Sequence, residues 1–138
     1  MLVHYSKRAS NTPAFALLAE GWNELVQDGF TAEGDGSPPV KPDDEVLYVQ
    51  GDSEDDVTGV LAFDHTLALT VRMVYVEPSS RRRGVFKAML ADLQEVGRTR
   101  GVDRIHMSAP VENAPFQAVL KHMGGPTIAV VYDMATQG

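Results

Sequence analysis

The sequence predicts an α/β (α+β) domain in which a central mixed, mostly antiparallel sheet carries helices on both faces. Two long segments repeat apolar residues at helical spacing. Several apolar segments of strand length are separated by short polar turns, which is typical of hairpins. In the second half of the chain, helices alternate with strands, and such crossovers place parallel neighbours in one sheet. The length of 138 residues suits one domain, which we expect to span residues 1–138.

The N-terminal part predicts a strand followed by a helix. Residues 2–8 form a short segment in which apolar and polar side chains partly alternate, as in a strand. Pro13 favours the first turn of a helix, with Asn11 or Thr12 as its cap, and Gly29 ends that helix. The apolar residues that recur there at helical spacing, and that we expect in the core, are Phe15, Leu18, Trp22, Leu25 and Val26.

The middle of the chain predicts a loop and three antiparallel strands. Residues 31–44 combine glycine, serine, proline and acidic residues, which favours a loop. Apolar segments at 45–51, 57–65 and 67–78 have the length and composition of strands, and their connections are short enough for hairpins. Pro78 ends the third strand because proline cannot donate to a strand ladder.

The C-terminal part predicts alternating helices and strands. A helix over 82–100 has an apolar stripe and ends at Gly101, and a strand follows over 102–109. Residues 113–123 predict another helix and residues 127–134 a final strand. The expected order is therefore strand, helix, three strands, helix, strand, helix, strand. The stripe of the first of these helices consists of Val85, Met89, Leu90, Leu93 and Val96.

Composition excludes several classes of site and partner. The chain has no cysteine, so it has no disulfide, thiolate nucleophile or cysteine-ligated metal, and its four histidines lack metal-ligand spacing. We expect no metal. No apolar run approaches the ~18 residues that span a membrane, and residues 1–10 lack the layout of a signal peptide. We therefore expect a cytoplasmic protein without a membrane partner. The net charge of −7 argues against nucleic acid as a partner.

The charges are unevenly distributed along the chain. Residues 20–64 contain thirteen acidic residues and one basic residue, whereas residues 71–104 contain eight basic and four acidic residues. Acidic loops that keep the protein soluble would explain the first region. They explain the second less well, because an acidic chain that gathers arginines in one place is typical of one that binds an anion there.

One junction predicts that anion site. A strand ends at Pro78, and Arg81, Arg82, Arg83 and Gly84 then lead into an amphipathic helix. The first turn of a helix presents unpaired N–H groups and the positive end of the helix dipole, and glycine lets a ligand approach the backbone. Phosphate or pyrophosphate fits such a site best. The alternative is that the arginines only solvate the helix start, where positive charge is slightly unfavourable.

At this junction the chain resembles the GNAT superfamily of acyl-CoA-dependent N-acyltransferases. The loop of that family reads Arg/Gln-x-x-Gly-x-Gly/Ala after a strand that ends in Val-x-Pro. Residues 81–86 of this chain read RRRGVF, and residues 76–78 read VEP. A later block of the family aligns with Asn113 and with the glycine pair at 124–125. The resemblance covers about half of the chain, and it implies a single GNAT-type domain.

The resemblance implies a binding site for acetyl-CoA. The backbone of Val74 and Val76 would bind the pantetheine arm as an added strand, and N–H groups of residues 81–86 would hold the pyrophosphate. Asn113 would contact the pantetheine or fix the following helix. The thioester would lie where the strand at 71–77 diverges from the strand at 106–109. The candidate cofactor-binding residues are Val74, Tyr75, Val76, Arg81, Arg82, Arg83, Gly84, Val85, Phe86 and Asn113.

Two positions depart from the family pattern. The last small residue of the loop is Phe86 here. Its side chain either points toward the cofactor and blocks the turn, or points into the core and leaves the turn open. Leu120 stands where the family often carries a tyrosine that protonates the leaving thiolate. Transfer without that acid would depend on positioning, which can contribute more to the rate than one general acid.

Three polar residues near the expected thioester are candidate catalytic residues. His106 and Ser108 lie on one face of the strand that would border the thioester, and Glu77 ends the other bordering strand. Each has a structural alternative: His106 as a half-exposed strand residue, and Ser108 and Glu77 as polar groups that face loops. Tyr132 in the last strand is a further candidate, with packing as its alternative.

The family resemblance leaves more than one function open. The first hypothesis is an N-acetyltransferase that moves an acetyl group from acetyl-CoA to an amine on a small molecule or a protein. The second is a GNAT-fold protein without catalysis that acts as an acyl-CoA sensor or as a structural or interaction module, as in some phage virion proteins. Leu120 and Phe86 favour the second. Many proteins of this fold form homodimers, although no exposed apolar stripe here predicts one.

A third hypothesis is a nucleotide-phosphate binder unrelated to CoA. The loop lacks the Lys-Ser/Thr pair of a P-loop and the three glycines of a dinucleotide-binding fingerprint, and both absences argue against it.

Overall fold

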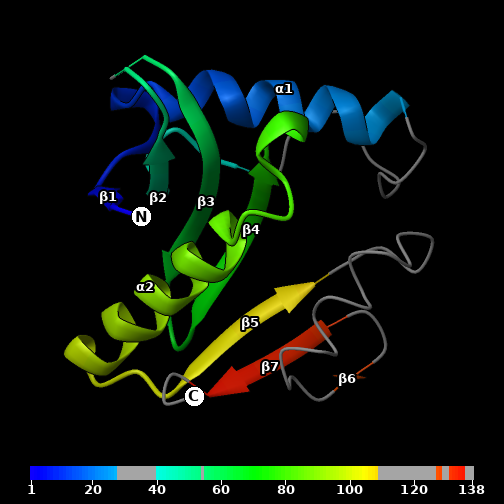
Figure 1. Ribbon diagram of the computed structural model, residues 1–138. Helices are drawn as coiled ribbons and strands as arrows, with labels where there is room; N and C mark the ends of the chain where they lie inside the picture. Colours follow the sequence, from blue (N-terminus) through cyan, green and yellow to red (C-terminus); the bar gives the residue numbers. More distant parts are fainter. Residues whose placement is uncertain (28–39, 54, 109–126, 129–130, 136–138) are drawn as a thin grey trace.

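A computed structural model describes residues 1–27, 40–53, 55–108, 127–128 and 131–135. Within these residues seven strands form one sheet in the order β1-β2-β3-β4-β5-β7-β6 (Figure 1). The strands are β1 Val3–Ser6, β2 Glu45–Gln50, β3 Val57–His65, β4 Leu69–Val76, β5 Arg104–Ser108, β6 Thr127–Ile128 and β7 Val131–Ala135. The helices of the same residues are α1 Ala14–Gln27 and α2 Val85–Arg100, with short 3₁₀ helices η1 Ala9–Asn11 and η2 Pro78–Ser80.

The sheet is mixed and mostly antiparallel, as the sequence predicts. The pairs β1–β2, β2–β3, β3–β4, β5–β7 and β6–β7 are antiparallel, and only β4–β5 is parallel among the described strands. The single strand expected at 127–134 is wrong, because β6 and β7 are two strands that pair with each other. An alternating pattern is the same in one long strand as in two short ones, so the sequence does not mark the turn. The helix expected at 113–123 and most of the loop expected at 31–44 lie outside the described residues.

Helix α1 covers one face of the sheet. Its buried residues Leu17 and Leu18 pack with strand residues of β2, β3 and β4, and Trp22 is half-buried against the same cluster. Phe15 is wrongly predicted as core, because it is 37% exposed. The Thr12 hydroxyl donates to the Ala9 carbonyl in the η1 turn at 2.8 Å. The side chains of the predicted core residues Leu25 and Val26 lie outside the description.

Helix α2 covers the opposite face, so helices pack on both faces. The predicted stripe is confirmed: Val85, Met89, Leu90 and Leu93 are buried against β2, β3, β4 and β5, and Val96 packs beside them. The helix ends before Gly101, as predicted, and Gly101 has φ 71° with its N–H bound to the Arg98 carbonyl. No helix among the described residues is long and apolar enough to cross a membrane.

Strand β4 contains a bulge that divides it into two parts. Phe63 of β3 lies opposite Val71, and Ala62 lies opposite Met73, so Arg72 is an extra residue on β4. Before the bulge β4 also pairs with β5, through Leu69 and Thr70. Beyond it the two strands diverge (Figure 1). A bulge bends its strand and increases the local twist, which explains the divergence.

Candidate functional site

The free edge of β4 beyond the bulge forms one side of the candidate site. The Glu77 N–H donates to the Thr58 carbonyl of the β3 side, at 2.9 Å. Backbone groups of successive strand residues point to alternate edges, so those of Val74 and Val76 point away from β3. No strand among the described residues pairs with that edge. The backbone of Tyr75 faces β3 instead, so of the three predicted strand residues only Val74 and Val76 turn backbone groups to the open edge.

A rigid turn connects this edge to α2. The Ser80 N–H donates to the Glu77 carbonyl at 2.9 Å, and the Arg81 N–H donates to the Pro78 carbonyl at 3.3 Å. The Ser79 hydroxyl donates to the Glu77 carboxylate at 2.6 Å. The backbone N–H of Arg81 is therefore already engaged. Within the described residues, the backbone N–H groups of residues 82–84, part of the expected phosphate-binding segment, donate to no other backbone group.

The start of α2 has the geometry of an anion site. Arg82 has φ 64° and Gly84 has φ 81°, and these two left-handed residues delay the helix start to Val85, three residues later than predicted. Arg82 adopts this region at a cost of about 1 kcal/mol, as an L-residue does. The intrahelical bond that closes the first turn runs from the Ala88 N–H to the Gly84 carbonyl at 2.9 Å. The N–H groups before it lack helical acceptors, and the first turn carries no acidic residue.

Packing fixes the position of this helix start. A Cβ on Gly59 of β3 would lie 2.4 Å from a methyl group of Val85, so only glycine lets α2 approach β3 so closely. Phe86 packs against the core cluster beneath α2. Of the two orientations open from the sequence, its side chain therefore takes the one toward the core. The expected phosphate turn is left unobstructed by this residue.

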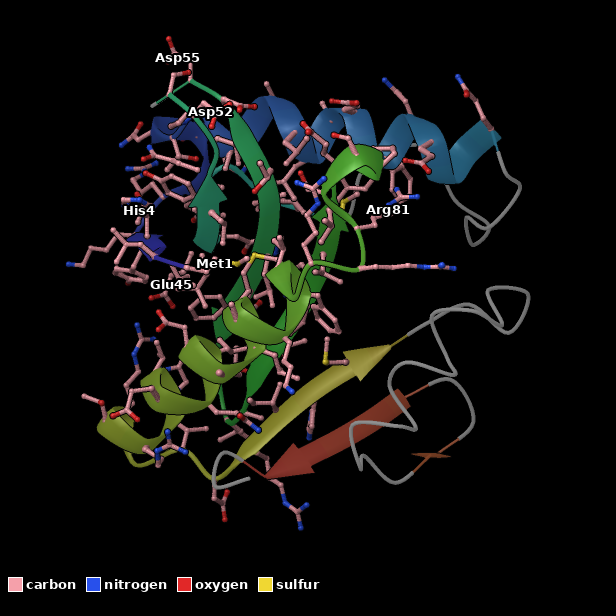
Figure 2. All side chains as sticks on the ribbon, viewed as in Figure 1. Met1, His4, Glu45, Asp52, Asp55 and Arg81 are labelled. Atoms are coloured by element: carbon pink, nitrogen blue, oxygen red, sulfur yellow. The ribbon has the colours of Figure 1, made fainter. Side chains whose placement is uncertain are left out.

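The three arginines of the turn differ in what they contact. Arg82 and Arg83 are exposed. The Arg81 guanidinium extends toward α1, where it donates to both carboxylate oxygens of Glu24 at 3.0 and 3.1 Å (Figure 2). The sequence analysis predicts the same role for all three arginines, as cations beside the phosphate. The charge of Arg81 is instead neutralised by Glu24, and no local pattern could reveal a partner 57 residues away.

The structure does not bring the three candidate catalytic residues together. His106 is half-buried and is the Cα partner of Thr70, at the last pair before β4 and β5 diverge. Ser108 follows two residues later on β5, and its side chain lies outside the description, as does that of Tyr132. Glu77 lies seven residues beyond Thr70, roughly 20 Å along the strand. The Glu77 carboxylate accepts the Ser79 hydroxyl, which supports its structural alternative. Asn113 and Leu120 lie outside the described residues.

Tyr75, one of the candidate cofactor-binding residues, makes a side-chain contact on the α1 side of β4 that the sequence did not predict. The Tyr75 hydroxyl bonds to the Glu24 carboxylate. Burial and this carboxylate both raise the pKa of Tyr75 well above its ordinary value. The same hydrogen bond, together with the Arg81 charge, holds the pKa of Glu24 below its usual range against the opposing effect of burial. Tyr75 is thus a neutral hydrogen-bond donor and Glu24 an anion at neutral pH.

Charged residues also lie at the bulge. Arg72 forms an ion pair with Asp64 of β3. The Arg72 Nε and Asp64 Oδ1 atoms are buried and have no hydrogen-bond partner among the described residues. Asp44 lies near this pair and is 5% exposed, and burial raises the pKa of its carboxyl group.

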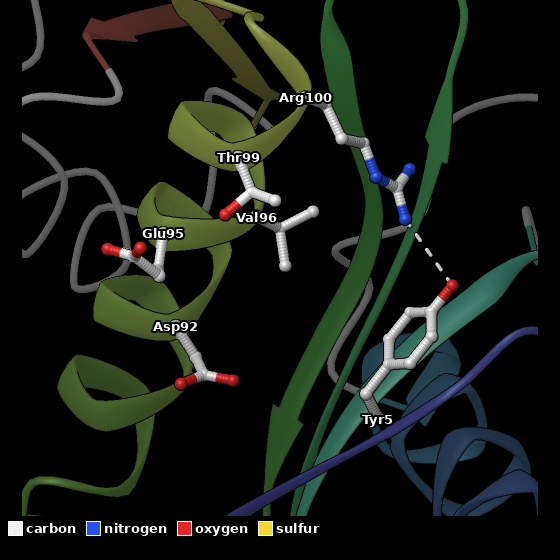
Figure 3. A pocket seen from close by; sticks show the side chains of 6 residues that line it. All are labelled: Tyr5, Asp92, Glu95, Val96, Thr99 and Arg100. Atoms are coloured by element: carbon white, nitrogen blue, oxygen red, sulfur yellow. Dashed lines mark hydrogen bonds between the residues drawn. The ribbon is translucent and has the colours of Figure 1, made fainter.

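A hollow of about 240 Å³ lies elsewhere, between β1 and the C-terminal half of α2 (Figure 3). Arg100 crosses it to donate to the Tyr5 hydroxyl at 3.3 Å and pairs with Glu45 at 2.5 Å. Its residues come from β1 and from the end of α2 that is remote from the expected phosphate-binding turn. It is therefore separate from the open edge of β4. The lining residues are Tyr5, Asp92, Glu95, Val96, Thr99 and Arg100.

The fold is that of one protein family. The model of the acetyltransferase (GNAT) family matches residues 12–124. The chain belongs to this family. No curated protein sequence matches the chain.

Solved structures of the family share the fold at low sequence identity. A GNAT-family acetyltransferase from Staphylococcus aureus Mu50 is 10% identical, with a TM-score of 0.75 over 99% of this chain and 100% of that one. Nourseothricin acetyltransferase is 24% identical, with a TM-score of 0.60 over 71% of this chain and 68% of that one. N-acetylglutamate synthase from Neisseria gonorrhoeae, solved with coenzyme A and N-acetyl-glutamate, is 11% identical. Its TM-score is 0.71 over 100% of this chain and 36% of the synthase chain.

Proposed function

We propose that this protein is an N-acetyltransferase that moves an acetyl group from acetyl-CoA to an amine. The observation that carries the proposal is the continuous path from the free edge of β4 to the start of α2. An extended chain of amides can pair with such an edge, and a pyrophosphate suits such a helix start. Acetyl-CoA carries both groups at the matching ends of one arm. Membership of the acetyltransferase family supports the same donor.

The residues present fit two parts of this cofactor, the pantetheine arm and the pyrophosphate. The backbone groups of Val74 and the N–H of Val76 would pair with the pantetheine amides, because they face the open edge. The Val76 carbonyl accepts the Arg81 Nε at 2.9 Å. The N–H groups at the start of α2 would hold the pyrophosphate, and the exposed side chains of Arg82 and Arg83 would add charge to this contact. Arg81 contributes through its position rather than its charge, since Glu24 neutralises it.

The reaction needs a neutral amine next to a thioester. The amine nitrogen attacks the thioester carbonyl carbon, a C–N bond forms, the C–S bond breaks, and the thiolate of CoA leaves. The amine proton passes to a base or to water. His106 is the candidate closest to the point where β4 and β5 diverge, and we propose it as the acceptor of that proton. Ser108 and Glu77 remain candidates of lower rank, because one side chain is not described and the other is bound to Ser79.

The acceptor is an amine on a small molecule or on a protein. The acidic residues of positions 20–64 would attract a cationic acceptor, because a field of one sign raises the local concentration of the opposite charge. Turnover should then fall as salt is added and should favour acceptors of higher charge. A rate that is insensitive to salt and to acceptor charge would contradict this steering.

Calorimetric titration with acetyl-CoA and with CoA tests the cofactor site. We expect micromolar binding by the wild type and a loss of about tenfold in affinity for Arg82→Glu and for Arg83→Glu, since each change reverses a charge beside the phosphates. Arg8→Glu reverses an exposed arginine before α1 and serves as the matched control. Equal affinities in all four proteins would remove the phosphate site from this turn.

Leu120 supports a second candidate function, an acyl-CoA sensor or interaction module without turnover. A leucine at the position of the family's tyrosine cannot protonate a thiolate. Thiol release from acetyl-CoA with a panel of amines distinguishes the two functions once binding is established. Release above the hydrolysis rate supports the transferase. Binding without release from any amine, and no gain in Leu120→Tyr, supports the sensor.

A further inference from the structure

The side chain of Arg81 connects three separate parts of the molecule. Its Nε donates to the Val76 carbonyl at the end of β4, at 2.9 Å. Its NH2 group donates to both oxygens of Glu24 on α1. The guanidinium carbon lies 5.5 Å from the centre of the Tyr75 ring. The residue that opens the phosphate-binding turn is thereby tied to a strand end and to a helix on the far side of the sheet.

The partners of Arg81 are themselves held in place. Tyr75 is 8% exposed and bonds to Glu24 through its hydroxyl. A Cβ on Gly21 of α1 would lie 2.6 Å from the Tyr75 ring, so α1 packs directly on this ring. Glu24 therefore has two fixed donors, one from Tyr75 and one from Arg81. A carboxylate held in this way can orient a guanidinium, whose planar donors are directional.

The arrangement does more for geometry than for stability. The side chains of Arg81 and Glu24 are 45% and 33% exposed, and ion pairs this exposed contribute little to the free energy of folding. The turn that follows Arg81 nevertheless contains strained Arg82 and left-handed Gly84. A strained turn keeps its conformation only where its surroundings fix it. Among the described residues, Arg81 is the residue of this turn whose side chain is bound to α1.

We propose that Glu24, Arg81 and Tyr75 form a latch that holds the phosphate-binding turn in its ligand-binding conformation. Glu24 and Arg81 are positioning residues, because they act on the cofactor through the turn and contribute no charge of their own to it. The inference rests on the proposed function, since the ligand of the turn is the CoA pyrophosphate. Without the latch the turn samples other conformations, and the apparent affinity falls in proportion to the competent fraction.

Glu24→Gln breaks the latch with the smallest change in shape. We expect the affinity for CoA to fall about three- to tenfold, as the competent fraction falls. The melting temperature should shift by less than about 2 °C, because the ion pair is exposed. Glu20→Gln is the matched control, since Glu20 of α1 also acts electrostatically on Tyr75 but, within the described residues, forms no ion pair with the turn. The control should bind CoA as the wild type does.

Two further measurements separate the latch from a general loss of structure. Hydrogen exchange of the ligand-free protein should accelerate in residues 78–86 of Glu24→Gln and stay unchanged elsewhere and in Glu20→Gln. Arg81→Lys keeps the charge but cannot make the three contacts, so we expect it to match Glu24→Gln. The double variant should be no weaker than either single one, because both changes remove the same interaction.

The outcomes decide the latch and the proposed function separately. The latch would be overturned if hydrogen exchange of residues 78–86 in Glu24→Gln were as slow as in the wild type. It would also be overturned if Glu24→Gln and Glu20→Gln changed CoA affinity equally, even if the wild type binds CoA tightly. If the wild type does not bind CoA, the proposed function is overturned. Faster hydrogen exchange in Glu24→Gln, confined to residues 78–86, would still support the latch in that case.

Discussion

The two parts of β4 have similar sequences but differ in how many of their edges pair with another strand. Leu69–Val71 and Met73–Val76 are both apolar and alternate between buried and half-buried residues. The first part pairs with β3 and, through Leu69 and Thr70, with β5, so it has strand partners on both edges. Among the described strands, the second part pairs with β3 alone, and no described strand pairs with its other edge. The single extra residue between them, Arg72, separates a structural segment from one that can bind an extended ligand.

The difference shows that this part of the site arises because β5 diverges from β4, and not because of a particular side chain. Val74 and Val76 are ordinary strand residues, and their side chains pack toward the α2 core. Their value for binding lies in backbone donors and acceptors, which any residue but proline would supply. Substitutions in the first part should therefore act on stability, and those that remove the outward-facing backbone donors of Val74 and Val76 should act on cofactor affinity.

Leu69→Ala should have the largest effect on stability. Leu69 is fully buried and lies between β3 and β5 in the α2 core, so its truncation leaves a cavity. We expect the free energy of unfolding to fall by about 2–5 kcal/mol in a urea titration. The affinity of the remaining folded protein for CoA should stay within about twofold, since additivity holds for distant sites. A large loss of affinity at conserved stability would contradict the division of β4.

Gly59→Ala should act on both properties, because Gly59 lies opposite Val76 and beneath Val85. The added methyl group would meet Val85 at 2.4 Å and displace the start of α2. We expect a loss of about 1–3 kcal/mol in unfolding free energy, as for other overpacked cores. CoA affinity should fall as well, since the helix N-terminus moves. Unchanged affinity at reduced stability would show that the turn moves independently of α2.

Val74→Pro tests the open edge directly. Proline removes an N–H that points away from β3, so no described ladder bond is lost, and proline is tolerated on such edges. We expect CoA affinity to fall about tenfold while the melting temperature changes by a few degrees at most. Met73→Pro is the control, because its N–H faces β3 and its loss should destabilise the fold. If Val74→Pro binds CoA like the wild type, the cofactor does not pair with this edge.

The sequence predicted the elements of the site better than their contacts. Periodicity placed both helices and the strands from β1 to β5, and the proline, arginines and glycine marked the turn at the start of α2. These signals are local, because they depend on residues a few positions apart. The left-handed φ of Arg82 places the helix start at Val85, later than predicted. The sequence does not indicate this conformation, because arginine rarely adopts positive φ.

The contacts that the sequence could not predict join distant segments. The bulge at Arg72 does not interrupt the alternation of apolar residues in β4. The prediction that β4 and β5 diverge therefore rested on the family resemblance alone. The pairing of Glu24 with Arg81 and Tyr75 depends on how α1 crosses the sheet. The orientation of Phe86 was open for the same reason, since one position in a helical pattern can face either the core or a ligand.

The smallest effect is expected at Asp44, beside the ion pair that marks the boundary between the two parts of β4. Burial raises the pKa of Asp44, with Asp64 and Asp43 adding to this and Arg72 opposing it. An acid whose pKa is raised on folding destabilises the protein as the pH rises through the folded pKa, and has no such effect below the unfolded value of about 3.9.

Asp44→Asn removes this titration and keeps an oxygen that can accept the Lys41 N–H, which now donates to Asp44 Oδ2 at 2.8 Å. We expect the melting temperature to rise by about 2 °C at pH 7. The gain should vanish as the pH falls below about 4, where the wild-type carboxyl is protonated in both states. Asp43→Asn changes an exposed neighbour and is the matched control. CoA affinity should be unchanged, because Asp44 lies at the boundary and not on the open edge. A lower melting temperature for Asp44→Asn at pH 7 would mean that the Asp44 anion is held by favourable contacts that outweigh its burial, and the boundary of β4 would then be stabilised by charge.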